Sequence, residues 1–86
     1  MSNLFSERGV NEILIAILIN KELNQSELEK ESNVSTFRIG KLLPSLILKD
    51  LVIEKRGMHN RKLLSLTDKG KEVATKLKEA KDAMQS

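Results

Sequence analysis

The stretch from residue 23 to residue 46, LNQSELEKESNVSTFRIGKLLPSL, decides how this chain folds. Asn24 and Glu27 have the spacing of a capping box, in which each side chain accepts a hydrogen bond from the backbone N–H of the other residue. They predict a short helix that runs through Leu28 to about Ser32. Asn33 suits the left-handed position that closes a helix.

A second helix is expected directly after the first. Ser35 is a candidate N-cap, and apolar residues then continue at helical spacing as one stripe to Leu51, through Ile39, Leu43 and Leu46. Two helices joined by so tight a turn form a helix-turn-helix. Its second helix, predicted over residues 35–49, is the candidate recognition helix.

Two residues inside this second helix normally disfavour helices. Pro44 has no N–H to donate, and its ring collides with the carbonyl of Gly40, four residues earlier. Because the apolar stripe passes through Pro44 in phase, we expect the helix to continue with a kink after Leu43.

The segment before the helix-turn-helix predicts another helix, which ends near Asn20. Ser6 is a candidate N-cap, and the apolar residues that follow at helical spacing are Val10, Ile13, Leu14, Ile17 and Leu18. Ile15 and Ile19 lie on its other faces, so the helix is apolar nearly all round. We therefore expect a second apolar surface to cover it, and we expect residues 21–23 to be a linker.

Two strands and a last helix follow the helix-turn-helix. Residues 51–55 and 62–66 are predicted strands of a hairpin around a basic loop, residues 56–61. Thr67 or Asp68 can cap a helix over residues 68–84. Its apolar residues have the spacing of a packing seam: Val73, Leu77, Ala80 and Met84.

Composition narrows the class of protein. The 86 residues are enough for a single domain over 1–86. The chain has no cysteine and one histidine, so we expect no disulfide, metal or cofactor. The longest apolar run, residues 13–19, is too short to cross a bilayer, and no signal peptide is evident. A cytoplasmic location is expected.

Positive charge is concentrated in the middle of the chain. Residues 1–34 carry three basic and six acidic side chains (3 − 6 = −3), residues 35–62 carry seven and two (7 − 2 = +5), and residues 63–86 carry five and four (5 − 4 = +1). A basic block of this kind is expected on a surface that meets phosphates, although acidic proteins and anionic membranes would also be attracted.

The order of these elements resembles a winged helix-turn-helix domain, which is a mostly helical α+β fold. The motifs that are similar to MarR-type and related small winged-helix regulators are Leu23-Asn24-Gln25-Ser26-Glu27-Leu28, Val34-Ser35, Ile39, Leu43, Leu46, Leu51-Val52 and, after the hairpin, Leu64-Ser65-Leu66-Thr67-Asp68-Lys69-Gly70. The chain departs from these families at four places. It has Glu29 where they usually have a small residue and Ser32 where they usually have an apolar one. It has Arg38 in place of the usual threonine and Gly40-Lys41 in place of the usual serine-arginine pair.

A recognition helix places its N-terminal turns in the major groove of DNA. Thr36, Phe37, Gly40 and Lys41 would then face DNA, with Arg38 at the margin and Ser45 further along the helix. Arg38 and Lys41 can reach guanine, and the hydroxyls of Ser35 and Thr36 can hold a phosphate.

Alternatives exist for two of these side chains. The alternative to a DNA contact for Arg38 is a surface salt bridge to Glu29 or Glu31. Phe37 is expected to be a partly buried prop in preference to a base-stacking platform.

The resemblance implies that the wing, residues 55–62, contacts the DNA backbone or the minor groove through Arg56, His59, Asn60, Arg61 and Lys62.

We also expect a homodimer, because a two-fold partner would cover the first helix and the seam of the last one. The expected interface residues are Ile15, Ile19, Val73, Leu77, Ala80 and Met84. The alternative is that the last helix packs across its own domain.

The predicted function is that of a dimeric, sequence-specific transcriptional regulator that binds double-stranded DNA. Two alternatives are an architectural, chromatin-type DNA binder and a winged-helix module that binds protein. An enzyme is not expected, because no catalytic constellation or phosphate-binding loop is present in the sequence.

Overall fold

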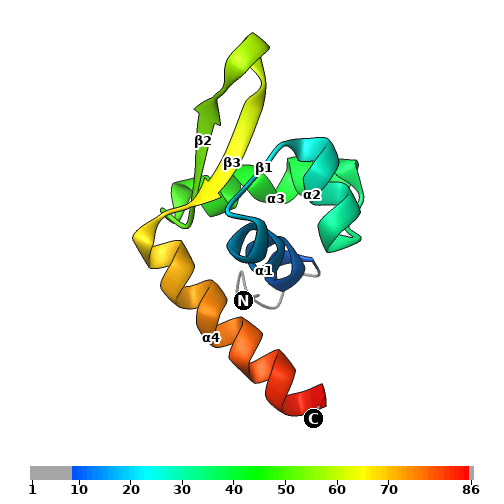
Figure 1. Cartoon of the computed structure of the whole chain (residues 1–86), viewed down its shortest axis with the longest axis vertical. Helices are drawn as coiled ribbons and strands as arrows, with labels where there is room; N and C mark the ends of the chain where they lie inside the picture. The colour runs from blue at the N-terminus through cyan, green and yellow to red at the C-terminus, as the bar shows by residue number, and fades with distance from the viewer. Residues whose placement is uncertain (1–8, 86) are drawn as a thin grey trace.

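Four α-helices and a small antiparallel sheet make up the computed structural model, which describes residues 9–85. In chain order the elements are α1 (Val10–Asn20), β1 (Glu22–Leu23), α2 (Gln25–Ser32), α3 (Thr36–Leu48), β2 (Val52–Arg56), a short 3₁₀ turn η2 (Met58–Asn60), β3 (Lys62–Leu66) and α4 (Asp68–Gln85) (Figure 1). The predicted fold class and layout, mostly helical α+β with a hairpin before the last helix, are confirmed. Within the described residues, no helix is long and apolar enough to cross a membrane.

Helix α1 forms the centre of the core. It begins after Gly9, which has a positive φ of 97°, and it ends at Asn20 as predicted. The candidate cap Ser6 lies outside the described residues. Four of the α1 side chains are fully buried: Val10, Ile13, Leu14 and Ile17.

The expectation that α1 needs a second molecule to cover it is wrong for most of its surface. Ile15 and Ala16, on its other faces, are also buried within the same chain, because α1 packs against α2, α4 and β3. Ile15, expected at a dimer interface, is therefore buried within its own chain, with 8% of its surface exposed. Ile19 is the exception, with 61% of its surface exposed.

Helices α2 and α3 have the predicted caps. Asn24 Oδ1 accepts from Glu27 N at 2.8 Å, and Glu27 Oε1 accepts from Asn24 N at 3.0 Å, which completes the capping box. Asn33 is left-handed, with φ 59°. Ser35 Oγ accepts from the backbone N of residue 38 at 3.2 Å and starts α3.

Ser32 stands where the resemblance implies an apolar residue, and the structure explains how the serine is accommodated. Its buried hydroxyl donates to the carbonyl of Leu28 at 2.5 Å and accepts from the N–H of Val34 at 3.3 Å. Both capacities of the hydroxyl are used inside the turn, so burying it leaves no polar group unpaired.

Helix α3 continues through Pro44, as predicted, and ends at Leu48. The stripe expected to reach Leu51 is too long, because Asp50 adopts a positive φ of 60° and turns the chain out of the helix. Leu51 is still buried, and its N–H donates to the carbonyl of Leu46 at 3.0 Å. The kink expected after Leu43 stays a prediction.

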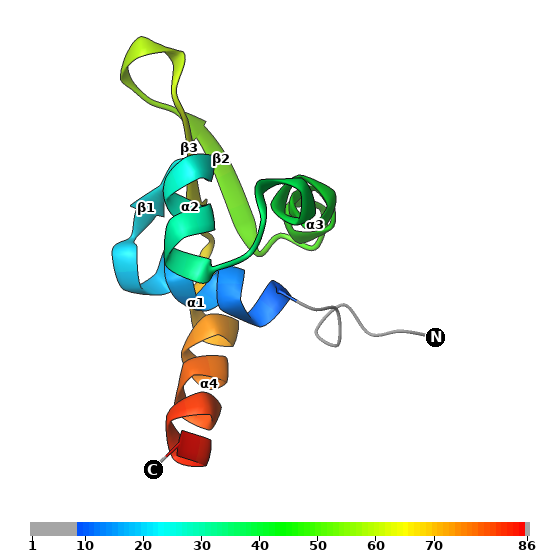
Figure 2. The ribbon, with the colours of Figure 1, turned by 90° about the vertical axis from the view of Figure 1, so that its right-hand side faces the viewer.

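The sheet has three strands in the order β1-β3-β2, all antiparallel. The hairpin β2-β3 is close to its predicted position and projects from the body as a wing, on the side opposite to α4 (Figure 2). Strand β1 lies where a linker is expected from the sequence. Leu23 pairs with Leu64 across the ladder, and both are buried, so the edge strand gains apolar contact that its short sequence does not indicate.

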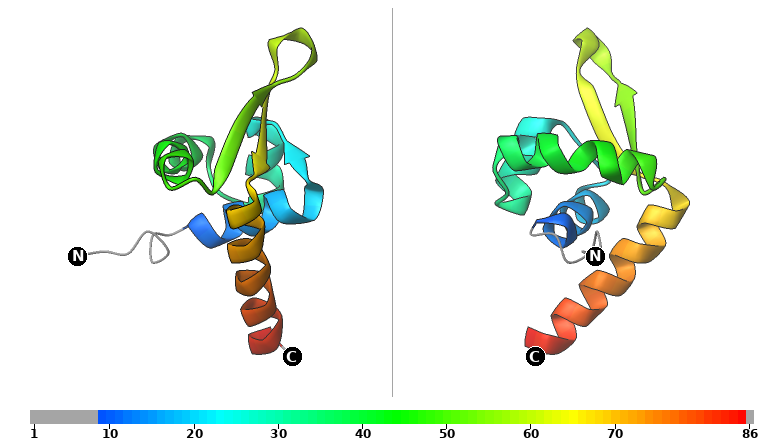
Figure 3. Two further views of the ribbon diagram at one scale, coloured as in Figure 1. Left: turned by 90° about the vertical axis from the view of Figure 1, so that its left-hand side faces the viewer. Right: turned by 180° about the vertical axis from the view of Figure 1, so that it is seen from behind.

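The apolar residues of helix α4 that pack on the core reach as far as Leu77. Thr67 Oγ1 accepts from the N–H of Gly70 at 2.9 Å and caps the helix. Ala74 is fully buried, and Val73 and Leu77 pack partly against the core of their own chain, which agrees with the alternative to a dimer seam. Ala80 and Met84 are exposed on the second half, which extends away from the body (Figure 3).

Candidate nucleic-acid interface

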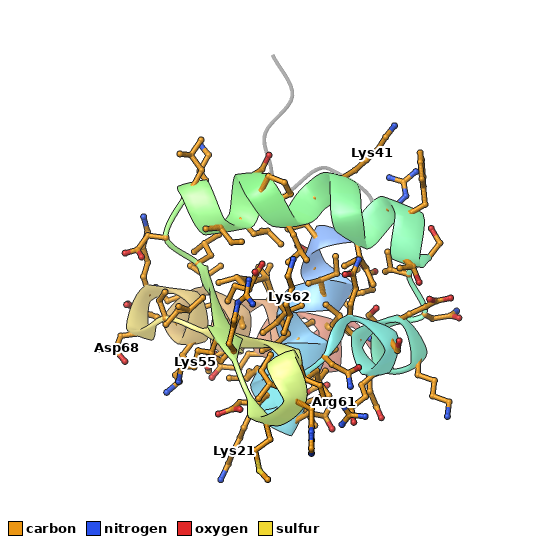
Figure 4. The ribbon with its side chains drawn as sticks, turned by 90° about the horizontal axis from the view of Figure 1, so that it is seen from above. Lys21, Lys41, Lys55, Arg61, Lys62 and Asp68 are labelled. Atoms are coloured by element: carbon orange, nitrogen blue, oxygen red, sulfur yellow. The ribbon has the colours of Figure 1, made fainter. Side chains whose placement is uncertain are left out.

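Two elements form the end of the molecule from which the wing projects. Viewed from that end, α3 runs along one side and the hairpin stands beside it, with the start of α2 next to α3 (Figure 4). Helix α3 contacts both α2 and β2, so its position relative to the wing is set by the core. The orientation of its side chains follows from the residues that it buries.

Helix α3 buries Ile39, Leu42, Leu43 and Leu46. The opposite face of its first turns therefore carries four other residues, which we call the α3 patch: Phe37, Gly40, Lys41 and Pro44. All four are exposed. The predicted assignment of Phe37, Gly40 and Lys41 to the outer face agrees with this arrangement.

Phe37 is not the partly buried prop that the sequence predicts. Its side chain is 75% exposed, and the ammonium nitrogen of Lys41 lies 4.9 Å from the centre of its ring. A cation within about 6 Å of an aromatic ring is attracted to the ring face. Phe37 and Lys41, one helical turn apart, thus form one unit on the surface of α3.

The hydroxyls at the start of α3 already have partners within the protein. Ser35 caps the helix, as described above, and Thr36 Oγ1 donates to a carboxylate oxygen of Glu29. The side-chain amide of Gln25 donates to the carbonyl of Thr36 at 3.5 Å. These contacts connect α2 to the first turn of α3.

Arg38 lies on the flank of α3 that faces the start of α1. A Cβ atom built on Gly9 would lie 3.4 Å from Arg38 Cδ, and Glu12 and Glu31 line the same surface hollow as Arg38. Gly40 lies on the other flank, which faces the wing. Arg38 is therefore further from the wing than the α3 patch is. Ser45, the remaining predicted residue of α3, is exposed.

The wing carries exposed cations on both of its faces. Arg56 and Lys62 are cross-strand partners, and Lys62 Nζ lies 3.8 Å from Glu54 Oε1 on the face toward α3. Arg61 and Lys55 point to the side away from α3 (Figure 4).

The wing tip is a short turn. His59 is exposed in it, with a positive φ of 61°, and Met58 beside it is also exposed. Asn60 belongs to the same turn, but its side chain lies outside the described part of the chain.

A hollow of about 210 Å³ separates α3 from the wing, and its lining includes two polar residues that sequence reasoning missed. Gln25 contributes from α2 and Glu54 from β2, beside Gly40, Pro44 and Lys62. The sequence carries a signal for each of these residues. Gln25 directly follows Asn24, the N-cap of α2, and Glu54 lies on the same face of β2 as Arg56, which pairs with Lys62.

No group of three or more potential metal-binding residues of the His, Cys, Asp and Glu types is found in the part of the chain that the structure describes.

The candidate site consists of a helix, α3, whose N-terminal half is exposed beside a basic hairpin. That arrangement defines a class of proteins, the winged-helix DNA-binding proteins.

The chain belongs to the winged helix-turn-helix family, whose model matches residues 7–85. It is a winged-helix DNA-binding protein, and the family is not enzymatic. Among curated proteins, no sequence match was found.

Several solved structures have a similar fold. The DNA-binding protein Sso10a-2 from Sulfolobus solfataricus matches 91% of this chain and 83% of its own, with a TM-score of 0.71 and 22% identity. MepR, a transcription regulator of the Staphylococcus aureus multidrug efflux pump MepA, matches 94% of this chain with a TM-score of 0.78 and 20% identity. MarR from E. coli matches 85% with a TM-score of 0.76 and 20% identity.

The relatives differ in length. This chain spans 62% of MepR and 55% of MarR. At such low identities the similarity is one of fold.

Proposed function

We propose that this protein is a dimeric, sequence-specific transcriptional regulator, in which α3 enters the major groove of double-stranded DNA and the wing contacts the backbone or the minor groove. The observation that carries the proposal is the placement of exposed cations on two adjoining elements, Lys41 on α3 and Arg56, Arg61 and Lys62 on the wing. Similarity in fold to the regulators MepR and MarR supports it.

The two elements would contribute differently to binding. Cations of the wing neutralise phosphates and release the counterions condensed on DNA, which gives affinity without sequence preference. The exposed half of α3 meets base edges, which carry the sequence information. Because Lys62 is paired with Glu54, Arg61 and Arg56 are the wing cations expected to contribute most.

We also propose that the protein dimerises through exposed apolar residues outside this interface. Ala80 and Met84 continue the seam of α4 past the point where the core covers it, and 88% of the surface of Met84 is exposed, as is 61% of that of Ile19. A two-fold dimer would present two recognition helices to successive major grooves.

The dimer is tested by light scattering at micromolar concentration. The unmodified protein should have twice the mass of one chain, and Met84→Glu should shift it toward monomer. Met58→Glu is the matched control, since Met58 is similarly exposed, at 82%, but lies on the wing. A monomer for the unmodified protein would rule out the dimer and, with it, a palindromic site.

A second candidate function is architectural binding with little sequence preference. The exposed cations of the wing favour it, because neutralising phosphates gives affinity without sequence preference. The similarity in fold to Sso10a-2, which is described simply as a DNA-binding protein, is compatible with this function.

Titration of labelled duplexes by fluorescence anisotropy separates the candidates. A random duplex and fragments of upstream genomic DNA are each titrated at low and at high salt. A preferred fragment that still binds in high salt would support the regulator. Steep loss of binding with no preferred fragment would select the architectural function. Absence of duplex binding at low salt would refute both.

A further inference from the structure

The α3 patch is poor in groups that read bases by hydrogen bonding. Phe37 and Pro44 are apolar, Gly40 has no side chain, and Lys41 is the only donor of the patch. Two of the polar groups beside it are engaged elsewhere: Thr36 donates to Glu29, and the amide of Gln25 donates to the carbonyl of Thr36.

The major groove also presents a feature that is not a hydrogen-bonding group. Each thymine exposes its C5-methyl there, and proteins distinguish thymine by placing apolar side chains against that methyl group. The hydrogen-bonding alternatives, Asn or Gln to adenine and Asp or Glu to cytosine, have no representative in the α3 patch. The α3 patch is therefore suited to contact the C5-methyl groups of thymine.

Phe37 is the residue that can make this contact. It lies in the first turn of α3, where recognition helices reach base edges, and its ring is 75% exposed. Removing that apolar surface from water on DNA binding would be favourable.

Lys41 gives the ring a defined position. Its ammonium lies 4.9 Å from the ring centre, one helical turn further along. The cation restricts the ring and also places positive charge beside it, within reach of a phosphate or of a guanine.

We propose that Phe37 contacts thymine C5-methyl groups in the major groove, so that thymine is the base this helix prefers opposite its first turn. The inference rests on the proposed function, since it requires α3 to enter the major groove.

The test compares thymine with deoxyuridine. A duplex selected from a random pool is prepared again with every thymine replaced by deoxyuridine, which removes the methyl from the major groove and leaves base pairing and the minor-groove edges intact. The unmodified protein should bind the deoxyuridine duplex about fourfold more weakly for each methyl that Phe37 covers, from ~0.8 kcal/mol per buried CH₂-sized group and ~1.4 kcal/mol per tenfold.

Two variants assign the effect to one side chain. Phe37→Ala should bind both duplexes equally, at about the affinity of the unmodified protein for the deoxyuridine duplex. Leu48→Ala is the matched control, because Leu48 is an exposed apolar residue of the same helix, 87% exposed, at its far end. It should keep the full difference between the duplexes. Circular dichroism establishes that each variant is folded.

The outcomes separate this inference from the proposed function. Equal binding of the two duplexes by the unmodified protein would overturn the inference and leave regulation by DNA binding intact. A difference that persists in Phe37→Ala would also overturn it, because another residue would then read the methyl. If no duplex is bound at all, the proposed function fails first. The comparison with unmodified protein does not depend on how well any variant folds.

Discussion

Gly40→Ala separates the stability of α3 from its use in binding. Gly40 lies inside α3 and is exposed, and a Cβ atom built there meets only the amide nitrogen of Gln25, at 3.8 Å, an ordinary van der Waals distance. Glycine in a helix interior is less favourable than alanine by roughly 0.5–1 kcal/mol. Because nothing blocks the methyl, the substitution should raise the free energy of unfolding by about that amount.

In a thermal melt, this gain corresponds to a rise in Tm of about 2–8 °C, since 1 kcal/mol shifts a domain of this size by roughly 4–8 °C. DNA binding should change in the opposite direction. If the backbone of α3 approaches the groove at Gly40, an added methyl holds it away, and anisotropy should report weaker binding.

Two outcomes would disagree with these expectations. A lower Tm would mean that the fold needs glycine four residues before Pro44. A higher Tm with unchanged affinity would mean that the α3 patch does not approach DNA at this position.

Three further substitutions test how the domain is built. Gly70→Ala should lower stability by about 1–3 kcal/mol in a denaturant titration, because the new Cβ would overlap the carbonyl group of Leu51 and lie only 2.9 Å from its carbon. The Leu51 backbone cannot move aside as a flexible side chain does. An unchanged midpoint would contradict the close packing of α4. Asn24→Ala removes the capping box and should cost about 0.5–2 kcal/mol in the same assay, whereas no loss would mean that α2 does not depend on its cap. Ser32→Ala leaves the buried N–H of Val34 without its partner and should cost roughly 1–3 kcal/mol. A stabilised Ser32→Ala protein would show that the position prefers the apolar residue of related families.

The sequence predicts the helices and the hairpin because each has a local signal. The capping box at Asn24, the cap at Ser35 and the turn at Asn33 are determined by residues within four positions of one another, and all three are present in the structure. Thr67 caps α4 for the same reason.

Features that depend on residues far apart in the chain cannot be predicted from local sequence patterns. Strand β1 exists because Leu23 meets Leu64, which follows some forty residues later, and two residues carry no periodicity of their own. The sequence predicts Ile15 at a dimer interface, because the covering of α1 by both α2 and α4 cannot be derived from one helix.

The candidate site was predictable in outline but not in chemistry. Helical periodicity placed Phe37, Gly40 and Lys41 on one face. It did not reveal that Phe37 is exposed beneath a lysine, or that Arg38 lies on the flank away from the wing, because both depend on which neighbours surround α3.

If α3 and the wing together bind duplex DNA, the salt dependence of binding must reflect cations on both elements. The slope of log K against log salt concentration is measured by anisotropy for the unmodified protein and for Lys41→Ala, Arg61→Ala and Lys76→Ala. The last of these variants is charge-matched, since Lys76 lies on α4 and pairs with Glu72 at 3.7 Å.

Lys41→Ala and Arg61→Ala should each weaken binding, and the slope should fall by about one for each phosphate that the variant no longer neutralises. Lys76→Ala should leave both the affinity and the slope nearly unchanged. Equal effects of all three substitutions, or no effect of Lys41→Ala and Arg61→Ala, would contradict the assignment of DNA binding to this surface.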